Sequence, residues 1–581
     1  MPGDYTPAVM TPHIWLARLP FSHCLLSSEL SMRILQSVAL SITLSSLAAS
    51  VLADTTLITN VNGYTLDVNR TLQQFSAIQF TDDLVDAIYN TVEDAPETAD
   101  TVIDGAGRTL IPGLVDAHGH VLSYGLSLLR VDVTGTSTEA EAAERVEAFA
   151  TANEELEWLL GRGWNQVLWD SNAFPTADSL DALVADKPVW LTRVDGHAGW
   201  ANSAAMELAG ITDRTVDPVG GQIIRDDNGA ATGVFIDNAM DLISANIPPV
   251  SREQIEYALV TAMQRLAGYG LTSVHDAGVG SSTIQAFKAL ADEGAMPIRV
   301  NVMIAAGDES YEQLLDQGTF TSADAMLNIN SVKIVADGAL GSRGAALIDD
   351  YSDEPGNRGL LLLDQERLEY LMRRAMNSGF QVNTHAIGDQ ANMLVMDNYQ
   401  NLIEETDSRN LRHRIEHAQV LRFEDILRFA ELGVIPSMQA THATSDKNMA
   451  QDRLGEVRIE GAYAWRKLLD AGAVIANGSD FPVESPNPFF GLHASVTRQD
   501  QNNEPPGGWF PEERMTLQEA FASFTIDAAY SGHQEELLGT LEAGKKADFI
   551  FLDRDMFTIP AEELWQLQAT ETWVGGQRIF P

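Results

Sequence analysis

The chain has 581 residues, of which 45% are hydrophobic and 7% aromatic, a composition typical of a folded protein with a large core. Its formal net charge of −45 at pH 7 argues against nucleic acids and anionic membrane surfaces as partners, because both would be repelled. Cys24 is the only cysteine, which excludes a disulfide within the chain.

Residues 1–53 come first, and we interpret them as a leader with a signal peptide. Met32-Arg33 precedes an apolar, serine-rich run, and Val51-Leu52-Ala53 offers small residues of the kind that a signal peptidase recognises. We therefore expect cleavage before Asp54, a periplasmic or secreted protein, and Met32 as the true start. The alternative is a membrane anchor, since the run is about long enough to span a bilayer. Its many Ser and Thr residues favour the signal peptide, so we expect no stable membrane anchor.

Residues 54–112 consist of short strand-like segments separated by polar turns, and residues 535–581 show the same pattern. Examples are 56–59, 76–80 and 547–552. Neither end of the chain has enough strands for a stable sheet by itself. We therefore predict that the two ends pair into one small β-sandwich, with 54–112 as its N-terminal half and 535–581 as its C-terminal half.

Strands and helices alternate from residue 113 to 534, which predicts an α/β fold built of parallel βα units. The candidate strands end at His118, Arg193, His275, Ala305, Ala336, His385, His417, Met438 and Asp480. A closed (β/α)8 TIM-like barrel needs eight strands, and we interpret 189–193 as the additional one. Because the gap between Val121 and Gly268 is longer than one βα step, we predict an inserted subdomain, about 122–268, at the barrel mouth.

Ligand-type side chains stand at the ends of several predicted barrel strands. His118 and His120 are two residues apart, so they share one face of a strand, and neutral imidazole is a common metal ligand. The other candidate ligands are Lys333, His385, His417 and Asp480. Taken singly, each histidine could cap a loop, and Asp480 could be a turn residue. Because the carboxyl ends of barrel strands converge on one mouth, the set together predicts a metal site.

Lys333 is the most informative member of this set. It lies between Val332 and Ile334 on a predicted buried strand, where a lysine is costly unless it is paired or modified. A neutral amine in that place could react with carbon dioxide to form a carbamate, whose two oxygens could bridge two metal ions.

Four stretches of the sequence, 111–120, 337–343, 476–480 and 541–548, together resemble the amidohydrolase superfamily. Within it, the chain is most similar to the large-insert branch (amidohydrolase family 3) that includes N-substituted formamide deformylase. The resemblance covers residues 54–581. It implies a metal-dependent hydrolase on a (β/α)8 barrel, with a β-sandwich built from both chain ends.

The resemblance also implies roles for the candidate ligands. His118 and His120 would hold the more buried metal, and His385 and His417 the second. The expected cofactor is a divalent metal, with two zinc ions per chain bridged by carbamylated Lys333. Some superfamily members use a single metal, so the count of two depends on that modification. Asp480 would be both a ligand and the shuttle that carries a proton from the attacking water to the leaving amine.

We predict His197, His275 and Arg343 as substrate contacts. Each has an alternative role. Arg343 could hold its loop instead of binding a substrate carboxylate, His275 could support a metal ligand, and His197 could be a hydrogen-bonded loop residue. The tryptophans of the insert are expected to be buried within it.

The leading functional hypothesis is hydrolysis of a non-peptide C–N bond, in a linear or N-substituted small-molecule amide, by a metal-activated water. The alternatives are a cyclic-amide or imidazolone-type hydrolase, a hydrolase of dipeptides or N-acyl amino acids, and a non-catalytic binding protein. The last fits least well, because binding alone requires no proton shuttle. The sequence leaves the substrate, the metal and the assembly open, and a homodimer is compatible with it.

Overall fold

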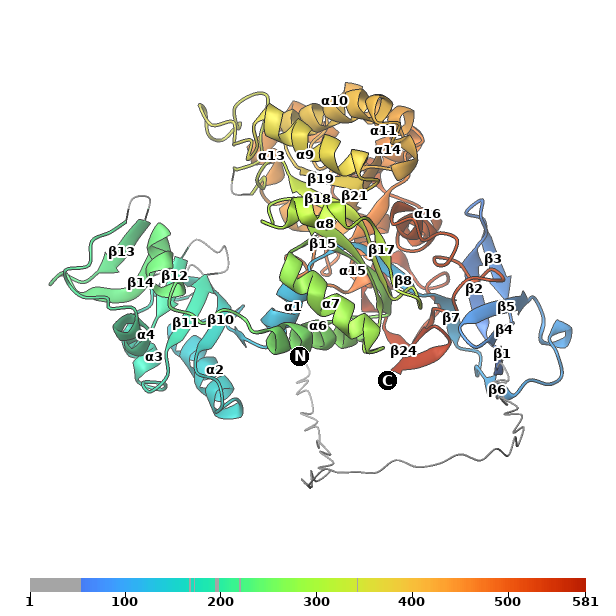
Figure 1. The fold of residues 1–581 in the computed structure, drawn as a ribbon, viewed down its shortest axis with the longest axis horizontal. Helices are drawn as coiled ribbons and strands as arrows, with labels where there is room; N and C mark the ends of the chain where they lie inside the picture. Colours follow the sequence, from blue (N-terminus) through green and yellow to red (C-terminus); the bar gives the residue numbers. More distant parts are fainter. Residues whose placement is uncertain (1–53, 167–168, 172, 194–197, 219–220, 342) are drawn as a thin grey trace, which may run out of the picture. The chain divides into compact units, whose positions relative to one another are not determined.

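The centre of the chain forms a barrel of parallel strands (Figure 1). The computed structural model describes residues 54–581 apart from 167–168, 172, 194–197, 219–220 and 342. In this part of the chain, the barrel strands are β8 (Leu114–Gly119), β15 (Leu271–Val279), β16 (Arg299–Ala305), β18 (Leu327–Val335), β19 (Gln381–Ala386), β20 (Arg414–His417), β21 (Ile435–Gln439) and β22 (Ala476–Gly478). They neighbour one another in this order, and a short strand, β17 (Phe320–Thr321), pairs antiparallel with β18.

The barrel closes where the segment after its last strand meets the first strand. The backbone N–H of Asp480 donates to the carbonyl of His118 at 2.7 Å, and the N–H of His120 donates to Phe481 at 2.8 Å. The predicted (β/α)8 barrel is therefore confirmed, and the closure itself brings the two ends of the candidate metal motif together.

The longer helices of the barrel have apolar faces that pack against its strands. α6, for example, begins with a capping box between Ser251 and Gln254 and buries Leu259, Met263 and Leu266. The helices after the insert are α6 (Arg252–Gly268), α7 (Ser281–Asp292), α8 (Tyr311–Asp316), α9 (Gln365–Asn377), α10 (Asp389–Glu405), α11 (Phe423–Leu432), α12 (Ala440–Asp446), α13 (Ala450–Arg458), α14 (Trp465–Asp470), α15 (Pro488–Thr497), α16 (Leu517–Ser523) and α17 (Ile526–Ser531).

The interior of the barrel is unusually polar below the candidate metal site. Side chains there that are no more than 2% exposed include Ser273, His275, Asn301, Asn383 and Arg414. Barrels of this class are commonly filled with branched aliphatic residues. Here Asn383 and Arg414 lie two residues before His385 and Glu416 on their strands, so they share the inward face one step below them. Within this polar interior, Arg414 donates hydrogen bonds to His275 and Glu416.

Both ends of the chain contribute to a β-sandwich. Its N-terminal strands are β1 (Thr55–Thr59), β2 (Asn62–Leu66), β3 (Leu72–Phe75), β4 (Ala77–Thr81), β5 (Leu84–Tyr89), β6 (Thr101–Asp104) and β7 (Thr109–Pro112). Its C-terminal strands are β23 (Phe549–Leu552), β24 (Ala569–Val574) and β25 (Gln577–Phe580). One sheet has the order β5-β4-β1-β6 and the other β25-β24-β23-β7-β2-β3.

The two chain ends meet where β7 pairs antiparallel with β23. Ile78 of one sheet packs with Phe549 and Trp573 of the other, so the pairing encloses a core of its own. A buried ion pair joins this sandwich to the barrel, because Arg299 at the start of β16 contacts Asp548 just before β23 at 2.7 Å. The predicted pairing of the two ends is confirmed.

The insert contains a sheet with the order β13-β14-β12-β11-β10-β9. Its elements are α1 (Val121–Leu128), β9 (Val131–Asp132), α2 (Glu139–Ala152), β10 (Leu159–Trp164), α3 (Ala177–Asp181), β11 (Val189–Arg193), β12 (Ala198–Ala201), α4 (Ser203–Leu208), β13 (Gly221–Arg225), β14 (Ala231–Asp237) and α5 (Asp241–Ser244). The additional predicted strand is β11 of this sheet, as expected. Trp164, Trp169 and Trp200 pack into the core of the insert. The predicted place of the insert at the barrel mouth stays a prediction.

The predicted leader, residues 1–53, lies outside the described residues, so cleavage before Asp54 and export stay predictions. Among the helices that the structure does describe, none is long and apolar enough to cross a bilayer.

Candidate metal centre

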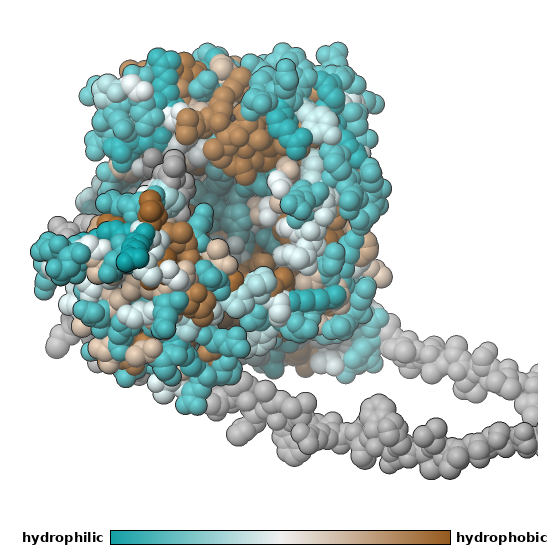
Figure 2. All heavy atoms as spheres, turned by 60° about the vertical axis from the view of Figure 1, so that its left-hand side comes forward, coloured by the Kyte–Doolittle hydropathy of each residue, from teal (hydrophilic) through white to brown (hydrophobic). Residues whose placement is uncertain are grey.

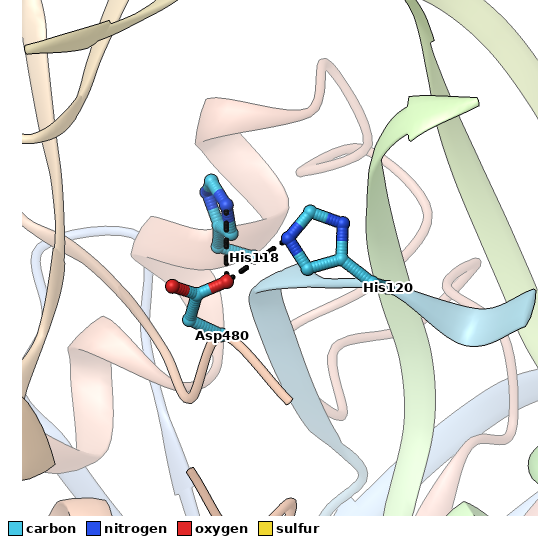
Figure 3. A group of neighbouring side chains, drawn as sticks. All are labelled: His118, His120 and Asp480. Atoms are coloured by element: carbon cyan, nitrogen blue, oxygen red, sulfur yellow. Dashed lines mark ion pairs between the residues drawn. The ribbon is translucent and has the colours of Figure 1, made fainter. Parts of the chain in front are cut away.

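His118, His120 and Asp480 point their side chains at one another (Figure 3). Oδ1 of Asp480 lies 3.0 Å from Nε2 of His120 and 3.6 Å from Nε2 of His118. The His118 side chain is fully buried, whereas 33% of the His120 side chain is exposed. Two imidazole nitrogens and a carboxylate oxygen that face a common point are a suitable donor set for a divalent metal.

A tight turn after β22 presents Asp480. Its backbone is in the left-handed region, with φ of +61°. Asp116 holds the turn, because its Oδ1 accepts the N–H groups of His118 and Ser479 and its Oδ2 accepts the Ser479 hydroxyl at 2.6 Å. Gly478 must lack a side chain, since a Cβ there would lie 2.5 Å from the backbone nitrogen of His118. The Gly-Ser-Asp sequence is thus required by the close approach of β22 and β8.

The carboxylate of Asp480 is held in its ionised form. Burial acts to raise its pKa, but the close contact with His120 and the nearby His118, His417 and His442 lower that pKa well below its usual range. An ionised Asp480 is able to bind a cation and to accept a proton.

Lys333 extends this donor set from β18. Its Nζ lies 3.1 Å from Nε2 of His118, and the residue is 6% exposed. Burial lowers the pKa of the Lys333 amine, against the opposing effect of Glu416 and Asp480. The lowered pKa increases the fraction of neutral amine, which is the form that reacts with carbon dioxide.

His385 and His417 lie beside this cluster at the ends of β19 and β20. Their ring centroids are 4.6 Å apart, and the His417 ring is 4.9 Å from that of His118. Burial, followed by the charge of Lys333, lowers the pKa of His118 to about 4 and that of His385 to about 3. These imidazoles are therefore neutral at physiological pH, as metal ligands must be.

The hydrogen bonds of the histidine rings show which ring nitrogens are free to bind a metal. Nδ1 of His118 donates to Glu416, Nδ1 of His120 to the carbonyl of Ala277 at 2.8 Å, and Nδ1 of His417 to Oε1 of Gln439 at 2.7 Å. In each neutral ring the other nitrogen, Nε2, is then left as a bare lone pair. Nε2 of His385 is buried and has no hydrogen-bond partner within the described part of the chain. The donor set fits a divalent metal, and His118, His120, Lys333, His385, His417 and Asp480 are the residues that would hold it.

Glu416 and Arg414 form a fully buried ion pair behind His118. Arg414 Nε lies 2.7 Å from Oε1 of Glu416, while Oε2 accepts the His118 Nδ1–H. Burial acts to raise the pKa of Glu416, but Arg414 and His118 hold it well below its usual range. A permanent anion behind the imidazole fixes its tautomer and makes Nε2 a stronger donor. Neither residue was among the predicted site residues, although both are charged residues on a buried strand, as Lys333 is.

Replacing Glu416 with glutamine should weaken metal binding about 10–100-fold, because the neutral amide cannot enforce the His118 tautomer. Competition with a calibrated chelator would measure this affinity. Glu535→Gln is the matched control, since Glu535 pairs with Arg412 outside the site. An unchanged affinity in Glu416→Gln would show that the carboxylate does not act through His118.

The predicted strand end at His275 is wrong. β15 continues to Val279, so His275 lies in the middle of the strand and is fully buried. Its Nδ1 accepts a hydrogen bond from Arg414 Nη1 at 3.0 Å. This place does not fit substrate contact. It fits the alternative role, in which His275 supports the residues that orient a metal ligand.

Arg343 is paired with acidic side chains. Its Nη2 donates to Asp353 at 2.9 Å and its Nε lies 3.3 Å from Glu354. Of the two predicted roles, this geometry fits the one in which Arg343 holds its loop. His197, the third predicted substrate contact, lies outside the described residues.

His442 is a residue of the site that the sequence analysis missed. It lies in the first turn of α12, three residues after the end of β21, and its Nε2 is 3.7 Å from Oδ2 of Asp480. With His417 and Asp480 it forms a second group that could hold a metal. The predicted strand ending at Met438 carried no ligand-type residue at its end, and a search a few residues further would have found His442.

Comparison with known proteins adds independent support. A sequence profile described as the amidohydrolase family matches residues 101–580. The putative amidohydrolase YtcJ of Bacillus subtilis (strain 168) is 33% identical over 494 residues, which cover 84% of this chain and 91% of YtcJ. N-substituted formamide deformylase of Arthrobacter pascens is 26% identical over 534 residues, which cover 90% of this chain and 97% of the deformylase.

A solved structure has the same architecture. The crystal structure of an uncharacterized metal-dependent hydrolase from Pyrococcus furiosus aligns with a TM-score of 0.72 and 27% sequence identity. The alignment covers 86% of this chain and 99% of that protein, so the likeness extends beyond the barrel.

Proposed function

The chain belongs to the amidohydrolase family and is a metal-dependent hydrolase of non-peptide C–N bonds, and we propose that its substrates are neutral linear amides such as N-substituted formamides. One observation carries the mechanistic part of this proposal. The side chains of four residues converge from β8, β18 and the turn after β22, with their donor atoms turned toward one another: His118, His120, Lys333 and Asp480.

We propose that two zinc ions occupy the centre and that Lys333 is carbamylated. The amine of Lys333 would attack carbon dioxide, form a new N–C bond and release one proton, giving a carbamate with two oxygens. When bound, divalent ions of this kind lower the pKa of a coordinated water and polarise a carbonyl oxygen. The lowered pKa of the buried lysine supports the carbamate, because only the neutral amine is a nucleophile.

Asp480 supplies the acid–base chemistry in this proposal. Its ionised carboxylate accepts the proton of the attacking water as the new C–O bond forms at the amide carbon. It then donates that proton to the amide nitrogen while the C–N bond breaks, so that a neutral amine leaves. The residue is 7% exposed, which limits proton exchange with bulk water during the two steps.

The surface beside the site supports a neutral, partly apolar substrate. Val335 at the end of β18 and the adjacent Leu361 and Leu362 are 41%, 37% and 57% exposed. Leu362 is fixed there by a hydrogen bond from its N–H to the carbonyl of Ala336 at 2.8 Å. Figure 2 shows a hollow in one face of the molecule with apolar surface along its rim. An apolar substituent on the amide would be desolvated favourably against such side chains.

Charge argues against anionic substrates such as N-acyl amino acids. Arg343, the cation predicted to bind a carboxylate, is already paired with Asp353 and Glu354. The net charge of −45 repels anions at longer range. The name of the Arthrobacter pascens relative supports N-substituted formamides as the first class to test.

A hydrolysis panel with purified, metal-loaded protein tests the proposal. N-formyl amines, N-acyl amino acids and cyclic imides of similar size would be compared by kcat/KM, with the released amine or acid quantified. We expect the neutral N-formyl amines to be the best substrates. A preference for N-acyl amino acids or cyclic imides would replace the proposed substrate class with one of the alternatives.

A further inference from the structure

The two oxygens of Asp480 have different surroundings. Oδ1 faces His118 and His120, the pair expected at the more buried metal. Oδ2 faces away from this pair, and the imidazole of His442 lies 3.7 Å from it. Neither the family resemblance nor the mechanism above gives His442 a role.

Nε2 of His442 is buried against the site and has no hydrogen-bond partner among the described residues. A buried polar atom without a partner is costly, so such an atom at a functional site calls for an explanation. The 3.7 Å separation from Asp480 exceeds a good N–H···O hydrogen bond by about 0.8 Å, a distance that a small rotation of either side chain can close.

We propose that His442 is a positioning residue that donates a hydrogen bond from Nε2 to Oδ2 of Asp480, so that Oδ1 stays turned toward His118 and His120. The inference rests on the proposed role of Asp480. A carboxylate can rotate about its Cβ–Cγ bond and exchange the places of its two oxygens. A donor on Oδ2 opposes this rotation and keeps Oδ1 on the side of the two imidazoles.

The surroundings of His442 favour this role over that of a further metal ligand. In His118, His120 and His417, an acceptor at Nδ1 fixes the ring with Nε2 as a bare lone pair. No described residue makes a hydrogen bond to Nδ1 of His442. Since an ionised carboxylate only accepts hydrogen bonds, the contact with Asp480 requires a hydrogen on Nε2, and nothing in the described surroundings opposes that tautomer.

Packing holds the imidazole in place for this contact. The ring is stacked on that of His417, with centroids 5.9 Å apart and an interplanar angle of 22°. One turn further along α12, Asp446 accepts hydrogen bonds from Tyr463 and Gln419 at 2.7 and 2.8 Å, which anchors the helix. The side chain of His442 is 13% exposed, so neither solvent nor packing gives it much freedom.

A double-mutant cycle on the metal-loaded protein tests the proposal. His442→Ala would be made in the natural chain and in Asp480→Asn, and kcat, KM and bound metal would be measured for each protein with the best N-formyl amine. We expect His442→Ala to lower kcat about 10–100-fold with little change in KM or metal content. In the Asp480→Asn background it should cause no further loss, because it acts through that carboxylate.

Two further variants keep the test interpretable. His442→Gln carries an amide N–H donor and should restore part of the lost kcat, and it also serves if the alanine variant does not fold. Ser445→Ala is the control on the same helix, since its hydroxyl bonds Glu484 rather than Asp480, and its kinetics should be unchanged.

Each of the following results would overturn the proposal. Loss of metal in His442→Ala would make His442 a ligand, a raised KM with unchanged kcat would make it a substrate contact, and equal losses in both backgrounds would separate it from Asp480. If Asp480→Asn alone keeps full turnover, the proposed function of Asp480 fails as well. If Asp480→Asn is inactive while His442→Ala is fully active, only this inference fails.

Discussion

Replacing Asp480 with asparagine is expected to lower turnover by at least about a hundredfold, the lower end of general acid–base contributions. The amide of asparagine has nearly the same shape and can still offer an oxygen to a metal, but it accepts no proton at neutral pH. Bound metal should therefore be largely retained by the four histidines and Lys333. Substrate affinity should change much less than turnover, since the loss falls on the transition state.

Metal analysis and steady-state kinetics on the same preparation of Asp480→Asn would check this expectation. Asp397→Asn is a suitable control, because Asp397 is an exposed partner of Arg428 away from the site. Retention of both metal and near-natural turnover in Asp480→Asn would show that another group moves the proton.

Replacing Lys333 with alanine should lower bound metal and activity together. A bridging carbamate needs the amine of Lys333, whose Nζ lies 3.1 Å from Nε2 of His118. Without it, two cations close together would lack the shared anion that offsets their mutual repulsion. We expect at least one of the proposed two ions to be lost and turnover to fall to near background.

Short carboxylic acids sharpen the Lys333 experiment. Acetate or propionate added to Lys333→Ala would supply the missing oxygens and should restore part of the metal and of the activity. Lys288→Ala is the matched control, because Lys288 lies over the ring of Phe320 and away from the centre. Full metal content and activity in untreated Lys333→Ala would rule out the carbamate-bridged pair of ions.

The sequence was sufficient to predict the features that depend on local periodicity. The alternation of strands and helices predicted the barrel, and the strand count identified 189–193 as the additional strand, which is β11 of the insert. Because neither chain end has enough strands for a stable sheet, the two ends were predicted to pair, and they do so between β7 and β23. The mutual approach of His118, His120 and Asp480 followed from one rule, that the carboxyl ends of barrel strands meet.

The features that the sequence did not predict depend on the exact length and partners of each element. A strand was expected to end at His275, but β15 runs four residues further and buries that side chain. Arg343 donates a hydrogen bond to Asp353, and this pairing depends on the conformation of the loop between them. His442 was missed because it follows its strand by a turn of helix rather than ending it. Tertiary packing determines such contacts, and the spacing of residues along the sequence does not predict them.

Titration of metal into metal-free protein shows whether this chain hydrolyses amides with bound metal. Metal would be removed with a chelator, its removal verified by elemental analysis, and zinc added back in steps while amine release from an N-formyl amine is followed. We expect no amine release without metal and a rate that rises with zinc until the centre is filled. Full activity in verified metal-free protein, or no amine release from any amide at full occupancy, would contradict this expectation.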